Sequence, residues 1–323
     1  MIKMKNMTMK MEFYKDKNVL ITGSSGLLGS HLLDLLTGSC HKIRVLTRNP
    51  STRYEDKISV FHGDLRDSAV VNKAIEDIDI VFHLAALVNV DKSISDPFET
   101  LTTNVLGTLN LLESARKQTN KPQIIFSSST SIYGIPKAKK MTEDHMISPS
   151  DPYSTSKAAA DLICQAYIKT YELPITILRS STLYGPRQPI TQFIPRVILQ
   201  GLSGQVLKLG SLSSYRDFCY VKDVATAFIL AGATPEAVCQ VFNISTEMSI
   251  NLVDVVEKIL KLLGQKSEIK TIDHHRPYEI TFPFTIDSSK LRKVLKWMPQ
   301  YDIDSGLKET IEWFKSTQIG SIN

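Results

Sequence analysis

The sequence predicts an α/β protein built on a doubly wound parallel sheet, followed by a smaller mixed α/β lobe. Short β-branched segments alternate with helical stretches through the first half of the chain, which is the pattern of a parallel sheet with crossover helices. A glycine-rich turn separates the first such segment from the first helix, and the alternation becomes irregular after about residue 180. We therefore expect a Rossmann-type domain over residues 18–180. A second lobe is expected over residues 181–323, with some of that chain returning to the first domain.

The expected strands are short and apolar, and most end in polar or glycine-containing turns. They cover residues 18–22 and 43–47, a segment ending at residues 60–65, and residues 79–86 and 123–126. Helices are expected from about residue 97 to 117 and from residue 154 to 171. Because ligands of such sheets bind beyond the carboxyl ends of the strands, we expect the functional site at that edge.

The composition is that of an ordinary globular protein, with 42% hydrophobic and 22% charged residues. The net charge of +5 comes from 38 basic and 33 acidic residues, and the basic residues are spread along the chain. This argues against a nucleic-acid surface and suits an anionic small substrate. The four cysteines show no metal or disulfide spacing, so we expect no metal and a reducing cytoplasm. No apolar run approaches ~18 residues, so no membrane span is expected.

The first 17 residues contain five methionines and five lysines, without the apolar segment of a secretory signal. We interpret residues 1–17 as a loose basic leader. Translation would begin at Met1 or at Met11.

A glycine turn between the first strand and the first helix has the context of a dinucleotide fingerprint. Gly23 permits the tight turn, Gly26 lets the backbone approach a pyrophosphate, and Gly29 lets the helix pack on the sheet. The pyrophosphate would bind the helix N-terminus, where free N–H groups favour anions. The spacing is G-x-x-G-x-x-G, and a plain glycine turn is the alternative. The predicted contacts of this loop are Gly23, Ser25, Gly26, Leu27, Leu28 and Gly29.

The end of the second strand bears on the choice between NAD and NADP. An NAD enzyme would place an acidic residue there for the ribose 2′-hydroxyl, but the sequence has Thr47 followed by Arg48. An arginine can pair with a 2′-phosphate. The cofactor expected is therefore NAD(P), with NADP favoured, although Arg48 would equally suit a solvated loop.

A tyrosine and a lysine stand four residues apart at the start of the helix expected over residues 154–171. Tyr153 and Lys157 therefore lie one above the other on one helix face. A free phenol, with a pKa of about 10, is a poor base at neutral pH, but a nearby ammonium favours the phenolate. The pair would then take a proton from an alcohol or return one to a ketone. An isolated Tyr-x-x-x-Lys match is a weak signal, so the interpretation depends on the rest of the chain.

Taken in order, these motifs resemble the extended short-chain dehydrogenase/reductase family, in its nucleotide-sugar epimerase/dehydratase branch. The resemblance covers nearly the whole chain after Lys17. The matching stretches are residues 23–29, 63–67, 83–86, 104–112, 127–134, 153–157, 178–187, 216–218 and 287–313.

The resemblance implies roles for individual residues. Tyr153 would be the catalytic acid and base, Lys157 would also bind the nicotinamide ribose, and Ser129 would hydrogen-bond the reacting oxygen. The implied cofactor contacts are Asp64 and Leu65 at the adenine and Leu84, Ala85 and Ala86 along the fourth strand. The implied substrate contacts are Ser129, Thr182, Gln192, Leu207, Leu209 and two diphosphate-binding arginines, Arg216 and Arg276. The resemblance also implies a homodimer in which the helices near residues 97–117 and 154–171 pair across a two-fold axis.

Departures from the family pattern restrict the chemistry. Family 4,6-dehydratases carry an Asp-Glu pair directly after the catalytic Ser or Thr, whereas this chain has Thr130 and Ser131. Hydroxyls cannot do that acid–base work at neutral pH, so dehydration is not expected. An asparagine typical of the substrate loop is replaced by Thr182, and the loop that begins at Gly210 lacks a second glycine. These changes leave the nucleotide base and the sugar open.

The function expected is hydride transfer between NAD(P) and C4 of a nucleotide-diphosphate sugar, by a 4-epimerase or a 4-keto-sugar reductase. Arg48 favours the reductase, because biosynthetic reduction consumes NADPH. The frequency of epimerases in the family favours the epimerase. One alternative is an NADPH-dependent reductase of a non-nucleotide ketone, in which Arg216 and Arg276 would be idle. The other is a non-catalytic NAD(P)-sensing protein, although the chain keeps Ser129, Tyr153 and Lys157.

Overall fold

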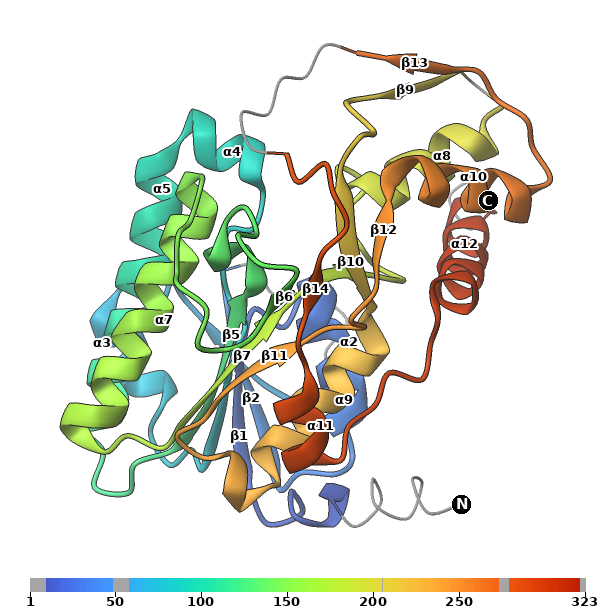
Figure 1. The fold of residues 1–323 in the computed structure, drawn as a ribbon. Coiled ribbons are helices and arrows are strands. Elements are labelled where there is room, and N and C mark those ends of the chain that lie inside the picture. The colour runs from blue at the N-terminus through green and yellow to red at the C-terminus, as the bar shows by residue number, and fades with distance from the viewer. Residues whose placement is uncertain (1–9, 49–57, 205, 273–278, 320–323) are drawn as a thin grey trace.

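The computed structural model describes residues 10–48, 58–204, 206–272 and 279–319, and its central feature is a seven-stranded sheet (Figure 1). The strand order is β11-β7-β5-β4-β1-β2-β3, and every neighbouring pair is parallel. The strands are β1 (Asn18–Thr22), β2 (Lys42–Thr47), β3 (Ile58–His62), β4 (Ile80–His83), β5 (Gln123–Ser129), β7 (Ile175–Ser180) and β11 (Val241–Ile244). The predicted α/β fold class is thus confirmed.

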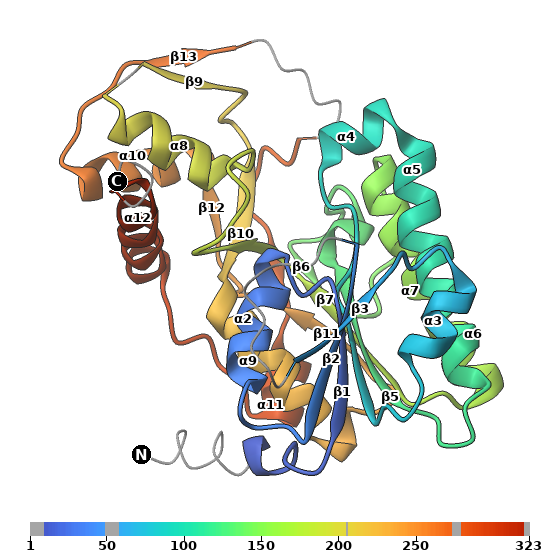
Figure 2. The same cartoon turned by 180° about the vertical axis from the view of Figure 1, so that it is seen from behind.

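Helices cover both faces of the sheet (Figures 1 and 2). One face packs against α2 (Leu27–Leu36), α9 (Val221–Gly232) and α11 (Ser289–Leu295), and the other against α3 (Ser68–Ala74), α6 (Gly107–Arg116) and α7 (Pro152–Tyr171). Each face has its own apolar core, which is why the strands read as nearly continuous apolar runs.

The helix expected near residues 97–117 is interrupted at its centre. It consists of α5 (Pro97–Leu101), a π-helical segment η1 (Thr102–Leu106) and α6. Asn104 lies in the wider π turn, and its side chain accepts from Leu87 N at 2.7 Å and donates to Leu87 O at 3.0 Å. Such turns often mark functional sites, and here one fixes the chain that leaves β4.

The second half of the chain builds a further core and also returns to the sheet. Strands β8 (Thr182–Tyr184), β10 (Tyr215–Tyr220) and β12 (Ser249–Asn251) form a three-stranded sheet that packs with α8 (Phe193–Leu202), α10 (Leu252–Leu263) and α12 (Ile303–Ile319). From this same half, β11, α9 and α11 complete the central sheet and its covering. The boundary near residue 180 stays a prediction.

The remaining elements are short and connect these two parts. They are α4 (Val90–Ser95), η2 (Thr130–Tyr133), β6 (Lys140–Met141), β9 (Leu207–Leu209), η3 (Pro235–Ala237), β13 (Ile269–Thr271) and β14 (Thr285–Ile286). β6 pairs with β14 and β9 pairs with β13, both in parallel. The β6–β14 pair links the first half of the chain to its C-terminal part.

The N-terminal segment corrects one expectation. Residues 1–9 lie outside the described residues, but residues 10–17 are anchored through Tyr14 and Lys10, while Glu12, Phe13, Lys15 and Asp16 are exposed. Tyr14 is fully buried beside Phe82, and its hydroxyl donates to Ile229 O at 2.7 Å. Lys10 donates to Ala233 O at 2.7 Å. The charge composition of the segment does not reveal this contact, because the contact depends on a single buried aromatic ring.

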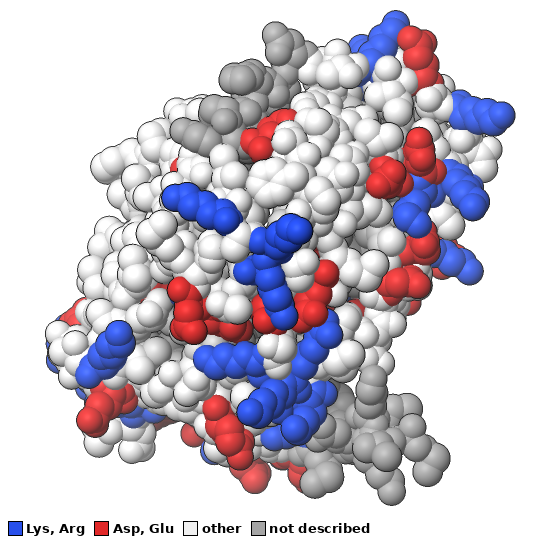
Figure 3. Space-filling model, viewed as in Figure 1, with Lys and Arg blue, Asp and Glu red and all other residues white. Residues whose placement is uncertain are grey.

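The surface carries both signs of charge. On the face shown in Figure 3, Lys and Arg side chains lie among Asp and Glu side chains. None of the helices in the described ranges combines the length and apolar character needed to span a bilayer.

Replacing Tyr14 by alanine should destabilise the protein. Truncating a large buried aromatic residue typically costs about 3–5 kcal/mol of unfolding free energy, and this change also removes the hydrogen bond to Ile229. Phe13→Ala is the matched control, because Phe13 is 39% exposed and should lose well under half as much. Urea denaturation of both variants measures the difference. Equal, small losses would mean that the segment does not contribute to the core.

Candidate active site

A cavity of about 770 Å³ lies at the carboxyl ends of the parallel strands and reaches the second lobe. Its volume is that of a typical small-molecule site. It is lined by residues from the glycine loop and from the ends of β2, β4, β5 and β7, together with α7, β8 and β10. This is the edge at which a doubly wound sheet binds its ligands.

The glycine loop has the backbone that a dinucleotide requires. Gly23 has φ +75°, and a Cβ on it would lie 2.7 Å from Ala85 N. A Cβ on Gly29 would lie 2.1 Å from Gly23 O, so only glycine lets α2 approach the loop this closely. Gly26 is the N-cap of α2, and among the described residues no side chain caps this end. The N–H groups of the first turn therefore suit a pyrophosphate.

The cofactor contacts predicted from the sequence all lie on this cavity. They are Gly23, Ser25, Gly26, Leu27, Leu28, Gly29, Arg48, Asp64, Leu65, Leu84, Ala85, Ala86, Tyr153 and Lys157. Their number and arrangement fit a bound NAD(P). The individual contacts remain predictions.

Arg48 and Asp64 lie together at the end of the cavity near β2. The Arg48 guanidinium is 3.9 Å from the Asp64 carboxylate, and its side chain is about half exposed. Asp64 also accepts two hydrogen bonds from the Arg66 side chain, at 3.1 and 2.7 Å. These bonds lower the pKa of the Asp64 carboxyl. Arg48 is thus the more available of the two guanidinium groups for an anion in the cavity.

Tyr153 and Lys157 stand on the first turns of α7. The helix begins at Pro152, and Asp151 caps it by accepting from Ser154 N at 2.8 Å. Lys157 is 5% exposed and donates to Ser127 O at 2.6 Å, so its ammonium is held against the end of β5. Both side chains line the cavity, with the tyrosine one helical turn before the lysine.

The electrostatics of this pair correct the sequence argument. Burial raises the pKa of Tyr153 to about 12, and a hydrogen bond with Ser129 lowers it only part of the way back. Burial also lowers the pKa of Lys157 to about 8. The expected net lowering of the tyrosine pKa is therefore wrong for the protein alone. Loss of water around the phenol raises its pKa more than the Ser129 hydroxyl lowers it.

Ser129 is the last residue of β5, and its hydroxyl oxygen accepts two hydrogen bonds from Ser131. Its Oγ accepts from Ser131 N at 3.1 Å and from Ser131 Oγ at 2.9 Å. The Ser129 hydroxyl also lies near enough to the Tyr153 phenol to lower the pKa of that phenol. Thr130 and Ser131, which replace the acidic pair of the dehydratases, also line the cavity. The three predicted catalytic side chains are thus brought together.

A buried ion pair supports this edge of the sheet from behind. Arg179 on β7 and Asp161 on α7 are 3% and 0% exposed, and two guanidinium nitrogens contact the carboxylate at 2.9 and 3.0 Å. Ser128 Oγ donates to the same carboxylate at 2.6 Å. β5 and α7 are therefore joined by polar contacts next to Ser129.

The substrate residues predicted from the sequence divide into three groups. Thr182, Gln192 and Arg216 line the cavity. Leu207 and Leu209 are buried in the core of the second lobe and do not appear among the described lining residues, because alternate residues of β9 face that core. Arg276 lies outside the described residues.

Two acidic residues of the site were missed by the sequence analysis. Glu279 lines the cavity and accepts from Ser211 Oγ at 2.7 Å and from Ser213 Oγ at 3.1 Å. Glu279 stands three residues after Arg276 in the sequence. This short distance from a predicted substrate-binding arginine is the signal that could have identified it. As a carboxylate, it suits a hydroxyl-bearing ligand.

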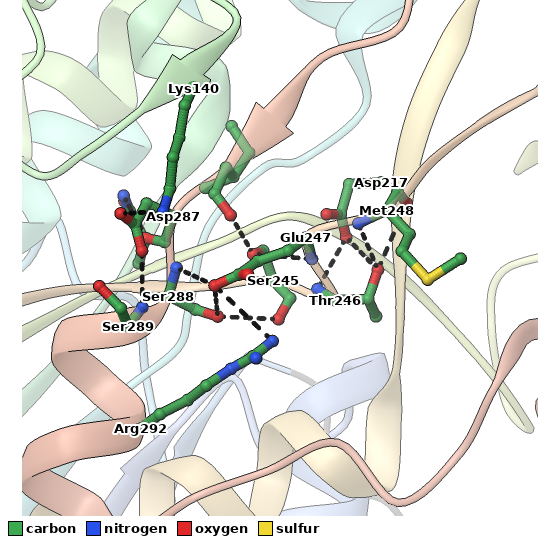
Figure 4. Close-up of polar contacts among 12 residues, drawn as sticks. Lys140, Asp217, Ser245, Thr246, Glu247, Met248, Asp287, Ser288, Ser289 and Arg292 are labelled. Atoms are coloured by element: carbon green, nitrogen blue, oxygen red, sulfur yellow. Dashed lines mark hydrogen bonds and ion pairs between the residues drawn. The ribbon is translucent and has the colours of Figure 1, made fainter.

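Asp217, the second, anchors the strand that carries Arg216. It is 2% exposed, and its Oδ1 accepts from Ser181 Oγ at 3.0 Å and from Thr246 N at 3.1 Å. Burial raises the pKa of Asp217 to about 6. Figure 4 shows it beside the loop of Thr246 and Glu247, whose carboxylate accepts from Ser288 N at 3.0 Å. This network connects Arg216 to the start of α11.

Among the described residues, no group of three or more His, Cys, Asp or Glu side chains is arranged to hold a metal ion. The pair His274-His275 lies outside the described residues. The described site combines a dinucleotide loop with a Ser-Tyr-Lys group, which is the arrangement of a dinucleotide-dependent oxidoreductase.

Comparison with known proteins agrees with this class. A model of the NAD dependent epimerase/dehydratase family matches residues 19–245. The chain therefore belongs to this family, which confirms the resemblance found in the sequence. It is thus of the extended short-chain dehydrogenase/reductase type.

Three similar proteins illustrate the range of the family. The trifunctional UDP-glucose 4,6-dehydratase/UDP-4-keto-6-deoxy-D-glucose 3,5-epimerase/UDP-4-keto-L-rhamnose-reductase of Arabidopsis thaliana is 34% identical over 324 residues, covering 94% of this chain and 48% of that protein. The chain thus spans about half the length of this relative. The dTDP-glucose 4,6-dehydratase of Mycolicibacterium smegmatis is 31% identical, covering 93% of this chain and 94% of that protein. The solved UDP-N-acetylglucosamine 4-epimerase of Methanobrevibacter ruminantium, in complex with UDP-N-acetylmuramic acid, has a TM-score of 0.86 at 30% identity, covering 94% and 99% of the two chains.

Proposed function

We propose that this protein transfers a hydride between NAD(P) and C4 of a nucleotide-diphosphate sugar, as a 4-epimerase or a 4-keto-sugar reductase. The observation that carries the proposal is a cavity lined by the glycine loop, by Ser129, Tyr153 and Lys157, and by Arg216. Such a site holds a dinucleotide at one end and an anionic ligand at the other. Its acid–base group lies between them.

Each side chain has a part in the reaction. The bound nicotinamide ring accepts or supplies the hydride. Tyr153 removes the proton from the C4 hydroxyl during oxidation and returns it during reduction. Ser129 hydrogen-bonds the same sugar oxygen, and Lys157 holds the ribose while its charge favours the phenolate. The raised pKa of Tyr153 in the protein alone means that positive charge near the phenol is needed to poise it near neutral pH.

Loss of water from the sugar is not part of the proposal, although relatives include 4,6-dehydratases. Dehydration needs an acid and a base at C5 and C6. In this cavity Thr130 and Ser131 occupy the two positions that follow Ser129, and neither hydroxyl titrates near neutral pH. Oxidation and reduction at C4 need only the groups that are present.

The diphosphate of the substrate is assigned to the arginine end of the cavity. The planar guanidinium of Arg216 suits bidentate contact with phosphate, and Arg276 is proposed as its partner. Thr182 and Gln192 are proposed substrate contacts. The nucleotide base and the sugar itself stay open. A non-nucleotide ketone would leave Arg216 without a role in substrate binding.

The proposed partners are limited to the substrate, the cofactor and a second copy of the chain, with no nucleic acid and no membrane. The mixture of positive and negative side chains on the face shown in Figure 3 supports the exclusion of nucleic acid as a partner. The cytoplasm is the proposed compartment, because all four cysteines lie in described ranges as free thiols.

Replacing Tyr153 by phenylalanine should abolish most of the activity and leave the fold intact. The ring and its packing remain, but the proton acceptor is lost, so turnover should fall by roughly 10²–10⁴. The assay uses a panel of UDP- and dTDP-sugars and 4-keto sugars, with mass detection and with chromatography to separate epimers. Tyr167→Phe on the same helix is the control. Unchanged turnover in Tyr153→Phe would refute the mechanism.

The preference for NADP depends on Arg48. We expect NADPH to bind more tightly than NADH, by about tenfold if one charge-assisted hydrogen bond to the 2′-phosphate is worth ~1.5 kcal/mol. Arg48→Ala should remove this gap. Arg48→Lys should keep part of it, because the charge remains without the planar fork. Fluorescence titration measures both affinities, and equal values in the unmutated protein would exclude the preference.

A homodimer through the helices of one face is proposed as the assembly. Large apolar side chains remain exposed on α5 and α7, among them Phe98 at 77% and Leu162 at 51%. A two-fold axis would bring each such helix against its copy and bury this surface. These residues belong to the helices for which pairing was predicted from the sequence.

Light scattering at micromolar concentration should therefore give the mass of a dimer. The double variant Phe98→Glu/Leu162→Glu should give a monomer, because charge on both helices opposes burial of the face. Val253→Glu is the control, since Val253 is exposed on α10 in the second lobe. A monomer mass for the unmutated protein would reject the proposal.

A further inference from the structure

The two hydrogen bonds that Ser129 accepts limit the hydrogen bonds that its own hydroxyl can still make. A hydroxyl has two lone pairs and one hydrogen. Ser131 supplies two donors to Ser129 Oγ, its backbone N–H at 3.1 Å and its Oγ at 2.9 Å, which is enough to engage both lone pairs. With both lone pairs engaged, the Ser129 hydroxyl has no acceptor capacity left for Tyr153. Any hydrogen bond between Ser129 and Tyr153 must be donated by Ser129.

We propose that Ser131 is a positioning residue, which makes Ser129 an obligate donor to the Tyr153 oxygen and, during turnover, to the sugar oxygen. The proposal rests on the function given above, because it takes Tyr153 as the acid and base. It assigns a role to the second of the two hydroxyl residues that stand where dehydratases carry acids. Ser131 itself contacts neither Tyr153 nor the reacting atoms in this account, so its effect passes through Ser129.

The direction of this hydrogen bond matters because it favours one protonation state of Tyr153. A donor aimed at the phenol oxygen stabilises the phenolate. If one lone pair of Ser129 were free, the neutral phenol could donate to it instead, and the neutral form would gain a hydrogen bond. Removing the Ser131 hydroxyl frees that lone pair while the bond from the Ser131 N–H remains. The Tyr153 phenol should then deprotonate at a higher pH.

Other groups also act on Tyr153 and must stay constant in a test. Asp151, the N-cap residue of α7, raises the pKa of the phenol, and Lys157 stands one turn further along the helix. Neither belongs to the turn that contains Ser131, which is η2. A substitution at position 131 therefore leaves both charges in place.

The experiment measures the ionisation of Tyr153 directly. The protein is loaded with NAD⁺ or NADP⁺ and titrated with base, following the ultraviolet absorbance of tyrosinate. Each variant is paired with the same variant carrying Tyr153→Phe, so that the remaining tyrosines cancel in the difference. Ser131→Ala should raise the midpoint by about one pH unit, the shift expected for one hydrogen bond to a charged group. Ser131→Thr, which restores the hydroxyl, should return the midpoint to that of the unmutated protein.

Two further variants keep the test decisive. Thr130→Val removes a hydroxyl from the same turn without affecting either bond to Ser129, and its midpoint should not move. If Ser131→Ala does not fold, Ser131→Cys replaces it, and its weaker donor should give a smaller rise in the same direction. An unshifted midpoint in the alanine or cysteine variant, or an equal shift in Thr130→Val, would overturn the proposal.

Turnover on the sugar panel provides a second readout. In Ser131→Ala the rate constant kcat should fall by about tenfold in the neutral range while KM changes little, because the donor orientation matters most when charge moves between the sugar oxygen and Tyr153. At a pH above the raised midpoint, kcat should recover. A panel on which the unmutated protein shows no turnover would contradict the proposed function, whereas the titration decides the role of Ser131 without any substrate.

Discussion

The Lys157 ammonium donates a hydrogen bond of 2.6 Å to the Ser127 carbonyl oxygen, and this contact joins α7 to the carboxyl end of β5. Because β5 pairs in parallel with both β4 and β7, its end is fixed on two sides at the edge where ligands bind. The first turns of α7 are thereby held beside Ser129. Tyr153 faces the cavity only because this helix begins where it does, at the Asp151 cap. The position of the Tyr153 side chain thus follows from the pairing of β5, the start of α7 and the Lys157–Ser127 hydrogen bond.

A buried ion pair makes the same junction rigid from the other side. Isolated buried charges are costly, so Arg179 and Asp161 are retained only because each satisfies the other and because Ser128 adds a third contact. Ser128 on β5 lies opposite Arg179 on β7 in the sheet register. The Arg179–Asp161 ion pair is therefore next to Ser129, the residue that follows Ser128. Asp217 differs from this pair, because only its Oδ1 is hydrogen-bonded, to Ser181 and Thr246, and among the described residues its buried Oδ2 has no hydrogen-bond partner. Its Oδ1 contacts still tie the strand of Arg216 to the loop after β11.

Local patterns carried most of what the sequence could predict. The first five strands, the glycine loop and the helix α7 follow from apolar runs, turn glycines and helical spacing, which are short-range signals. Features that depend on distant contacts did not follow. Tyr14 is buried by α9 more than two hundred residues later, and Leu207 turned out to face a core that is completed by α10 and α12. The direction of the Tyr153 pKa shift was predicted wrongly for the same reason, because the spacing to Lys157 does not reveal that the phenol is buried.

The most direct test of the account follows the hydrogen at C4. UDP- and dTDP-sugars deuterated at C4 are incubated with the protein and NAD(P)⁺, and the corresponding 4-keto sugars with C4-deuterated NADPH or NADH. Hydride transfer at C4 predicts deuterium at C4 of an epimer in the first case or at C4 of a reduced sugar in the second, with no loss of water. Deuterium at C6 of a product lighter by one water would show dehydratase chemistry and contradict it. Absence of any label transfer across the whole panel would contradict it as well.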